Sequence, residues 1–145
     1  MTPVVSIIMG STSDLPVMEK AAKFLDEMEI PFEMHALSAH RTPEEVEQFA
    51  KGAKGRGIKV IIVPINSTLD GMDALLAIVQ MPPGIPVATV GINGAQNAGI
   101  LAVQMLAIGD EALQNKLAQY KEDLKKKIVK ANEDLAKISF KYKTN

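Results

Sequence analysis

The chain lacks several features that would place it in particular classes of protein. It contains no cysteine, so it can form neither disulfide bonds nor thiolate metal sites, which fits a reducing compartment. Its 16 Lys and Arg residues are balanced by 17 Asp and Glu residues, which argues against nucleic-acid binding and against attachment to an anionic membrane. No apolar run reaches membrane-spanning length, and residues 4–10 lack the charged flank of a signal peptide. We therefore expect a cytoplasmic protein.

The length and composition are typical of one globular domain. A chain of 145 residues buries enough apolar surface to hold a core without covalent staples. Hydrophobic residues make up 47% and charged residues 23%, which are ordinary values. We expect a single domain over residues 1–145, with an α/β core at residues 1–108 and a C-terminal helical arm at residues 109–145.

Four short apolar runs alternate with helical patterns along the chain. The runs VVSIIMG (residues 4–10), PFEMHAL (31–37), KVIIVPI (59–65) and IPVATVGI (85–92) predict strands. The first run is β-branched and apolar on both faces, which is typical of a buried parallel strand. This β-α-β-α-β-α-β order predicts an α/β fold of three layers, αβα, with a parallel sheet. Such a fold is flavodoxin-like or Rossmann-like, and here a long C-terminal helix follows it.

The helix between the second and third strands has clear signals at both ends. Thr42 is the expected N-cap and Pro43 the first helical residue. Glu45 follows three residues after Thr42, which completes a capping box. Arg56 and Gly57 are expected at its end. The helix after the third strand is expected to stop before Pro82.

The last two helical segments expose more apolar surface than one subunit can cover. Residues 98–108 are apolar nearly all round, and a sheet buries only one face of a helix. The final segment has an apolar stripe at steps of three and four, formed by Leu113, Leu117, Tyr120, Leu124, Ile128, Ala131, Leu135 and Ile138. This helix either lies across its own domain or reaches a neighbouring subunit, and we favour the second. Together the two segments predict a homo-oligomer.

Polar residues follow the first predicted strand, at the edge where open parallel sheets bind ligands. In residues 10–14, Gly10 lets a ligand approach the backbone, and the hydroxyls and free N–H groups at the helix start favour phosphate. Asp14 would repel phosphate but accept hydrogen bonds from sugar hydroxyls. A phosphorylated sugar satisfies both demands, although an ordinary capped helix explains these residues equally well.

The second polar cluster, residues 38–41, follows the second strand. Arg41 can clamp a phosphate through two hydrogen bonds, and His40 can carry a proton near neutral pH. A lone histidine is usually structural, but both groups lie at the expected ligand edge, so we favour a functional role here. His35, by contrast, lies inside a strand on the same face as Glu33 and is expected to be a packing or surface residue.

A third polar cluster is less informative. Asp70 and Asp73 lie at the start of a predicted helix, beside residues 66–68, and we interpret them first as ordinary partners of the helix dipole. The glycine-rich segment at residues 91–99 precedes the apolar helix. It either approaches a ligand or allows tight packing.

Four segments read in order carry a resemblance to a known family. MGSTSD (9–14), SAHRTP (38–43), LDGMDALLAIVQMPPGIPVATV (69–90) and NAGILAVQ (97–104) resemble the 5-(carboxyamino)imidazole ribonucleotide mutases. That family is also described as the catalytic subunit of phosphoribosylaminoimidazole carboxylase. The resemblance implies an isomerase of purine biosynthesis, which moves a carboxyl group from the exocyclic nitrogen of its ribonucleotide substrate to a ring carbon. It also implies a homo-octamer that needs no ATP, metal or organic cofactor.

The resemblance also implies roles for individual residues. His40 would be the general acid and base, giving a proton to the departing nitrogen and later removing one from the ring carbon. The substrate would be held by five residues, the ribose phosphate portion by Ser11 and Asp14 and the phosphate by Ser13, Ser38 and Arg41.

One block of the family pattern is absent between Ile62 and Val63. The resemblance leads us to expect there a glycine- and alanine-rich loop with a second histidine, then a helix and a strand, which together line the carbon dioxide pocket. Either the block is lost, which would expose apolar surface to solvent, or the sequence omits residues of the full polypeptide. We favour the second. Three alternatives to the mutase remain: a carboxylase that uses carbon dioxide directly, a non-catalytic nucleotide-binding protein, and a purely structural oligomer.

Overall fold

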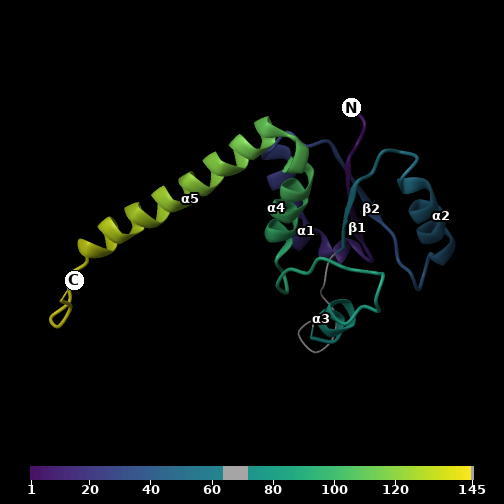
Figure 1. The fold of residues 1–145 in the computed structure, drawn as a ribbon. Coiled ribbons are helices and arrows are strands. Elements are labelled where there is room, and N and C mark those ends of the chain that lie inside the picture. The colour runs from purple at the N-terminus through teal and green to yellow at the C-terminus, as the bar shows by residue number, and fades with distance from the viewer. Residues whose placement is uncertain (64–71, 145) are drawn as a thin grey trace. The chain divides into compact units, whose positions relative to one another are not determined.

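The computed structural model describes residues 1–63 and 72–144 (Figure 1). The chain forms two compact units, Met1–Leu106 and Ala107–Asn145. The first unit holds a parallel sheet and the helices that cover it. The second unit consists of a short 3-10 turn and a long helix.

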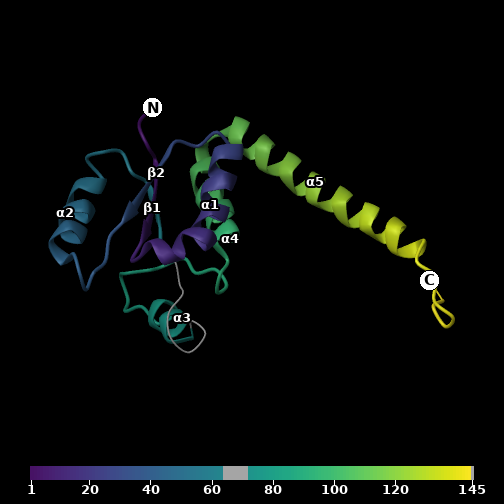
Figure 2. The ribbon, with the colours of Figure 1, turned by 180° about the vertical axis from the view of Figure 1, so that it is seen from behind.

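The first unit is built on the parallel sheet. β1 (Val5–Met9) lies in the centre, with β2 (Phe32–Ala36) on one side and β3 (Val60–Ile62) on the other. Val5 is in register with both Phe32 and Val60. Figures 1 and 2 show α2 on the opposite side of the sheet from α1 and α4, so β1 is covered on both faces and is almost entirely buried. The predicted three-layer fold with a parallel sheet is confirmed.

Two helices pack tightly against each other on one face of the sheet. α1 (Leu15–Glu27) buries its apolar side, including Phe24, and α4 (Ala95–Leu106) buries Gly99 and three neighbouring positions. A Cβ atom at Gly99 would lie 3.3 Å from the carbonyl oxygen of Ala21 and 3.3 Å from Cδ1 of Phe24. Glycine therefore lets the two helix backbones approach closely.

On the other face, α2 (Pro43–Ala53) begins at the predicted proline, with Thr42 as its N-cap residue. The predicted capping box is wrong in its hydrogen bond, because the side chain of Thr42 makes no bond to the helix start. The hydroxyl bonds instead to the backbone of Ser38, which it can reach because the preceding turn folds back on it. After the helix, Gly57 adopts a positive φ of 88° and turns the chain toward β3.

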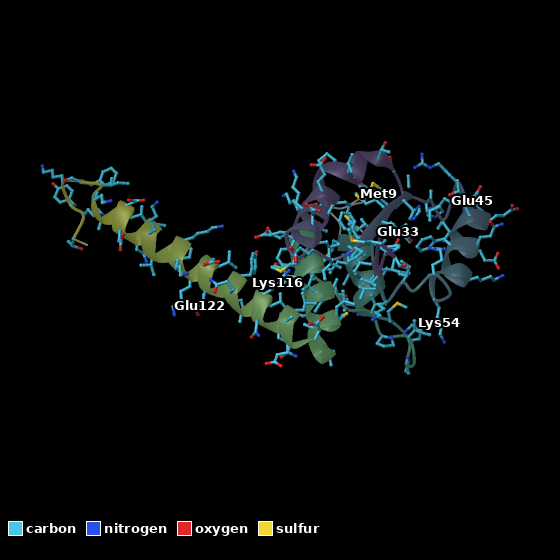
Figure 3. All side chains as sticks on the ribbon, turned by 90° about the horizontal axis from the view of Figure 1, so that it is seen from above. Met9, Glu33, Glu45, Lys54, Lys116 and Glu122 are labelled. Carbon is cyan, nitrogen blue, oxygen red and sulfur yellow. The ribbon has the colours of Figure 1, made fainter. Side chains whose placement is uncertain are left out.

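A small cluster joins α2 to β2. The ring of His35 lies 5.4 Å from the ring of Phe49, and the guanidinium of Arg56 lies 4.7 Å from the same ring. Arg56 donates a hydrogen bond of 3.1 Å to Glu33, and Nε2 of His35 lies 3.3 Å from the same carboxylate oxygen. His35 is thus a packing residue, as predicted. Figure 3 shows Glu33 in the sheet, with Glu45 on α2 and Lys54 just after its end.

The predicted fourth strand, residues 85–92, is wrong, because these residues form no strand in the structure. A cavity of about 530 Å³ separates residues 86–90 from β3, with α3 (Met72–Val79) and α4 also lining it. A strand needs a neighbour to accept its backbone hydrogen bonds, and β3 does not reach these residues across the cavity. Apolar side chains around the cavity are exposed to solvent, and Val63 is 62% exposed.

The remaining helix predictions agree with the structure where it describes the chain. α3 ends before Pro82, as expected, while Asp70, at the predicted start of that helix, lies outside the described residues. The last two residues of the third predicted strand, 64 and 65, lie outside them as well. In the described ranges, no helix is both long enough and apolar enough to cross a membrane.

The second unit is dominated by α5 (Glu111–Ala136), which follows the 3-10 turn η3 (Ala107–Gly109). Asp110 caps α5, since its side chain accepts a hydrogen bond of 3.0 Å from the backbone N–H of Leu113. Much of the predicted apolar stripe is exposed, with Ile128 at 65%. Figure 3 shows side chains projecting along the whole helix. The apolar stripe is therefore largely uncovered within this unit.

Candidate functional site

Two of the predicted polar clusters lie side by side at one edge of the sheet. β1 ends at Met9 and β2 at Ala36, and these strands are parallel neighbours, so their carboxyl ends meet at the same edge. The backbone N–H of Leu37 donates to the carbonyl of Met9 at 2.8 Å, which carries the pairing past the strand ends. Residues 10–14 and 38–41 follow directly. The structure therefore brings the two clusters together.

The first cluster is shaped by a tight helical turn. Ser11 caps the 3-10 helix η1 (Thr12–Asp14), and its hydroxyl accepts a hydrogen bond of 3.3 Å from the backbone N–H of Ser13. Asp14 is the N-cap residue of α1, but its carboxylate makes no capping bond. The Ser13 hydroxyl is exposed, whereas Ser11 and Asp14 are half-buried. These groups surround the start of α1, where the helix dipole attracts an anion.

Arg41 links the second cluster to the first. Its Nη2 donates to the carbonyl oxygen of Gly10 at 2.6 Å, and its Nε lies 3.5 Å from the hydroxyl of Ser38. The backbone N–H of Arg41 also donates to that hydroxyl at 3.3 Å. A guanidinium has five N–H donors, so donors remain for a ligand. The positive charge of Arg41 is thus held at the end of β1, beside residues 10–14, whose hydroxyl and N–H groups suit a phosphate.

His40 lies next to this anchored arginine. It is exposed, and within residues 1–63 and 72–144 it has no hydrogen bond or ion pair. Its imidazole is therefore free to meet a ligand, and imidazole in general can donate and accept protons near neutral pH. In the same described ranges, no group of three or more His, Asp or Glu side chains could hold a metal ion.

The third cluster is only partly described. Residues 66–68 and Asp70 lie outside the described residues. Asp73 lies in the first turn of α3, where a carboxylate interacts favourably with the helix dipole, as predicted. In the glycine-rich segment, Asn93 has a positive φ of 58°. A Cβ atom at Gly94 would lie 2.6 Å from the carbonyl oxygen of Gly91, so this turn needs glycine for its own packing. The glycine-rich segment is expected either to approach a ligand or to allow tight packing, and at Gly94 the geometry supports packing.

At this edge of the sheet, Thr42 behaves differently from its prediction as a side-chain cap of α2. The sequence presents it as a helix cap, and nothing in the local pattern distinguishes a cap from a hydroxyl that turns back. Only its spacing of four residues from Ser38 could have suggested the contact, because a tight turn brings such positions together. In the structure the Thr42 hydroxyl bonds to the backbone of Ser38 rather than to the start of the helix.

The family of the chain follows from comparison with known proteins. The family model described as AIR carboxylase matches residues 4–63 and 60–127. The chain belongs to the AIR carboxylase family. The resemblance carried by the four sequence segments is therefore confirmed.

Relatives of this AIR carboxylase family member share most of its length. It is 49% identical over 148 residues to the N5-carboxyaminoimidazole ribonucleotide mutase of Pyrococcus abyssi, covering 86% of this chain and 85% of the relative. It is 44% identical over 163 residues to the mutase of the same name from Thermotoga maritima, covering 96% and 95%. The corresponding mutase of Methanocaldococcus jannaschii is 45% identical over 154 residues, covering 92% and 98%.

Solved structures of the family share its fold. A PurE2 variant from Treponema denticola superimposes with a TM-score of 0.73 at 26% identity, covering 93% of this chain and 99% of that chain. A structure of PurE from the same organism gives a TM-score of 0.72 at 25% identity, covering 92% and 98%. The α/β architecture is thus common to these proteins and to this chain.

The family match is interrupted at the end of β3. Its two parts meet at residues 60–63, and the alignment with the Thermotoga maritima mutase extends over 163 residues, more than the 145 of this chain. Relatives therefore contain positions that have no counterpart here. The interruption falls where the sequence predicts a missing block, between Ile62 and Val63, and the cavity beside β3 borders the same point.

Proposed function

We propose that this chain is an N5-carboxyaminoimidazole ribonucleotide mutase of purine biosynthesis. It would convert 5-carboxyaminoimidazole ribonucleotide to 4-carboxy-5-aminoimidazole ribonucleotide by moving the carboxyl group from the exocyclic nitrogen to the ring carbon. The observation that carries the proposal is the identity of 44–49% to relatives of that name, over most of the chain. The adjoining clusters at the sheet edge support it independently.

The ribonucleotide would bind across the two clusters. Ser13, Ser38 and Arg41 would hold the phosphate, because hydroxyls, N–H groups at a helix start and a guanidinium all suit that anion. Ser11 and Asp14 would hold the ribose phosphate portion, since a carboxylate accepts hydrogen bonds from sugar hydroxyls. The phosphate is thereby kept at one end of the site, and the imidazole ring of the substrate faces His40.

His40 would move the protons of the reaction. It gives a proton to the exocyclic nitrogen as the bond to the carboxyl carbon breaks and carbon dioxide leaves. The trapped carbon dioxide then forms a bond to the ring carbon, and the imidazole removes the proton from that carbon. Because the phosphate end is tethered, the ring stays in reach of His40, and orientation of this kind contributes several kcal/mol, with about 7–11 as a ceiling. We propose that no ATP, metal or organic cofactor takes part.

A homo-oligomer, which we propose to be an octamer, would accompany this activity. The exposed apolar stripe of α5 supports the proposal, because a stripe of this length is stable in water only when it is covered. The absence of cysteine supports a cytoplasmic location. Neither nucleic acid nor a membrane is proposed as a partner, since the charges balance.

A second candidate is a nucleotide-binding protein that has lost catalysis. The interruption at residues 60–63 favours it, because the predicted missing block would line the carbon dioxide pocket. In this case the phosphate cluster would still bind the nucleotide, while trapping of carbon dioxide would fail.

The test is an assay of the purified chain with 5-carboxyaminoimidazole ribonucleotide as substrate and His40→Asn as the control. Formation of the ring-carboxylated product, absent in the control, is the expected result. A parallel reaction with aminoimidazole ribonucleotide and bicarbonate separates the direct carboxylase from the mutase. Calorimetric binding without turnover would favour the non-catalytic protein, and absence of both would overturn the proposal in favour of a purely structural oligomer.

A further inference from the structure

The hydroxyl of Thr42 is used in a way that does not serve its helix. The backbone N–H of Ser38 donates to Oγ1 of Thr42 at 3.0 Å, and the same hydroxyl donates to the carbonyl oxygen of Ser38 at 3.1 Å. The backbone N–H of Thr42 donates to that carbonyl as well, at 2.7 Å. A threonine at an N-cap position ordinarily accepts from the helix, yet α2 has no side-chain cap. The hydroxyl is committed to the turn instead.

These bonds close residues 38–42 into a short loop that is fixed at both ends. At its start, Leu37 is hydrogen-bonded to Met9 of β1, and at its end Pro43 begins α2. The N–H of Arg41 lies within the loop and donates to the carbonyl of Ser38 at 3.2 Å. The shape of this loop therefore sets the backbone positions from which His40 and Arg41 project.

The chemistry at position 42 is restrictive. Only a hydroxyl can accept from one backbone group and donate to another through a single atom, so serine can replace threonine here but valine cannot. Valine keeps the shape of threonine, but it would leave the half-buried N–H of Ser38 without its partner. The loop would then lose the bonds that link its first and last residues through a side chain.

We propose that Thr42 is a positioning residue of the active site, which it serves by holding the loop that carries His40 and Arg41. The inference rests on the proposed function of that site. The hydroxyl itself touches no substrate in this account. It sets the separation between the guanidinium on the phosphate and the imidazole on the ring, and misplacement by about 1 Å can cost a factor of about 100 in rate.

The test compares Thr42→Val with Thr42→Ser. Thr42→Val is expected to lower kcat/KM at least about tenfold, the factor that corresponds to one lost hydrogen bond of typical strength. Thr42→Ser is expected to restore most of it. Hydrogen exchange of the Ser38 amide, followed by NMR, should be fast in Thr42→Val and slow in Thr42→Ser and the parent chain. Thr89→Val is the matched control, because within residues 1–63 and 72–144 that hydroxyl bonds only to the carbonyl of Val87, at 3.5 Å.

Unfolding midpoints recorded for all three variants separate a local change from loss of the fold. Unchanged kcat/KM in Thr42→Val, despite a freely exchanging Ser38 amide, would overturn the proposal, as would equal losses in the valine and serine variants. If even the parent chain shows no mutase activity, the proposed function fails, and ribose 5-phosphate binding decides the inference. Thr42→Val should then bind about tenfold more weakly, and equal affinity, or no binding by the parent chain, would overturn it.

Discussion

At the residue scale, the candidate site depends on backbone bonds that hold a few side chains in place. Arg41 is held because its guanidinium bonds to the carbonyl of Gly10 and its backbone to Ser38. His40 has no such bond in the part of the chain that the structure describes, so its direction depends on its neighbours. A residue that is placed in this way can exchange protons with a bound ring without first breaking a contact of its own.

Replacement of His40 by asparagine separates binding from proton transfer. His40→Asn keeps a polar side chain of similar reach but removes the titratable group, and general acid–base catalysis is worth about 10²- to 10⁴-fold. We expect ribonucleotide binding within about threefold of the parent chain, by calorimetry, and a fall in kcat of roughly that size. A variant with full turnover would mean that another group carries the proton.

At the element scale, packing between β2 and α2 illustrates which contacts a sequence pattern can predict and which it cannot. The alternation in residues 31–37 puts Glu33 and His35 on one face, and the helix pattern puts Phe49 on the buried side of α2. Both features are local and both are predictable. The meeting of Arg56 with Glu33, 23 residues apart, depends on how the helix lies on the strand and has no signal in either segment.

Glu33 gives this contact a pH dependence. Partial burial raises the pKa of Glu33, but hydrogen bonding and charge from His35 and Arg56 outweigh it and hold the pKa below its usual value of 4.5. The ionised form therefore stabilises the folded state, fully so above pH 4.5, and this contribution is lost as the pH falls through the lowered folded-state pKa.

Replacement by glutamine removes that contribution. We expect Glu33→Gln to lower the free energy of unfolding at pH 7 by about 1 kcal/mol, with a difference from the parent chain that shrinks below pH 4.5. Urea unfolding at a series of pH values measures it. Glu27→Gln, at an exposed position of α1, is the matched control and should show no such trend. A difference that stays constant down to pH 3 would contradict the assignment.

At the scale of the whole molecule, each of the two units leaves an apolar surface uncovered. One surrounds the cavity between β3 and residues 86–90, and the other is the stripe along α5. The first lies where the family match is interrupted, so its cover would come from polypeptide between Ile62 and Val63. The second lies on α5, a helix of 26 residues, and we propose that another subunit covers it.

Filling the cavity should stabilise the fold. Insertion between Ile62 and Val63 of the expected missing block, taken from a family member, should raise the free energy of unfolding by about 3 kcal/mol or more, since burial of each large apolar side chain contributes about 1.5–3 kcal/mol. Urea unfolding and binding of a hydrophobic dye measure the change. An insert of equal length, rich in glycine and serine, is the control. Equal stability of the two inserts would show that the cavity does not accept the segment.

The stripe of α5 should govern assembly. Leu124→Lys together with Ile128→Lys places two charges on the stripe, and we expect a lower subunit count by light scattering after gel filtration, because buried unpaired charges are costly. Asn115→Lys together with Gln119→Lys adds the same charge on the opposite side of the helix. That control should assemble like the parent chain, and identical masses for all three proteins would exclude the stripe as an interface.

The sequence alone determined the first three strands, the helices in their order along the chain, and the edge where residues 10–14 and 38–41 meet. These follow from periodicity within each segment and from the parallel order of the strands, which are properties of neighbours along the chain. The tertiary structure decided that Thr42 bonds to Ser38 rather than to its helix, that Arg41 reaches Gly10, and that residues 85–92 form no strand. Each of these depends on which groups lie within hydrogen-bond reach across space, and a strand-like sequence without a neighbouring strand has nothing to pair with.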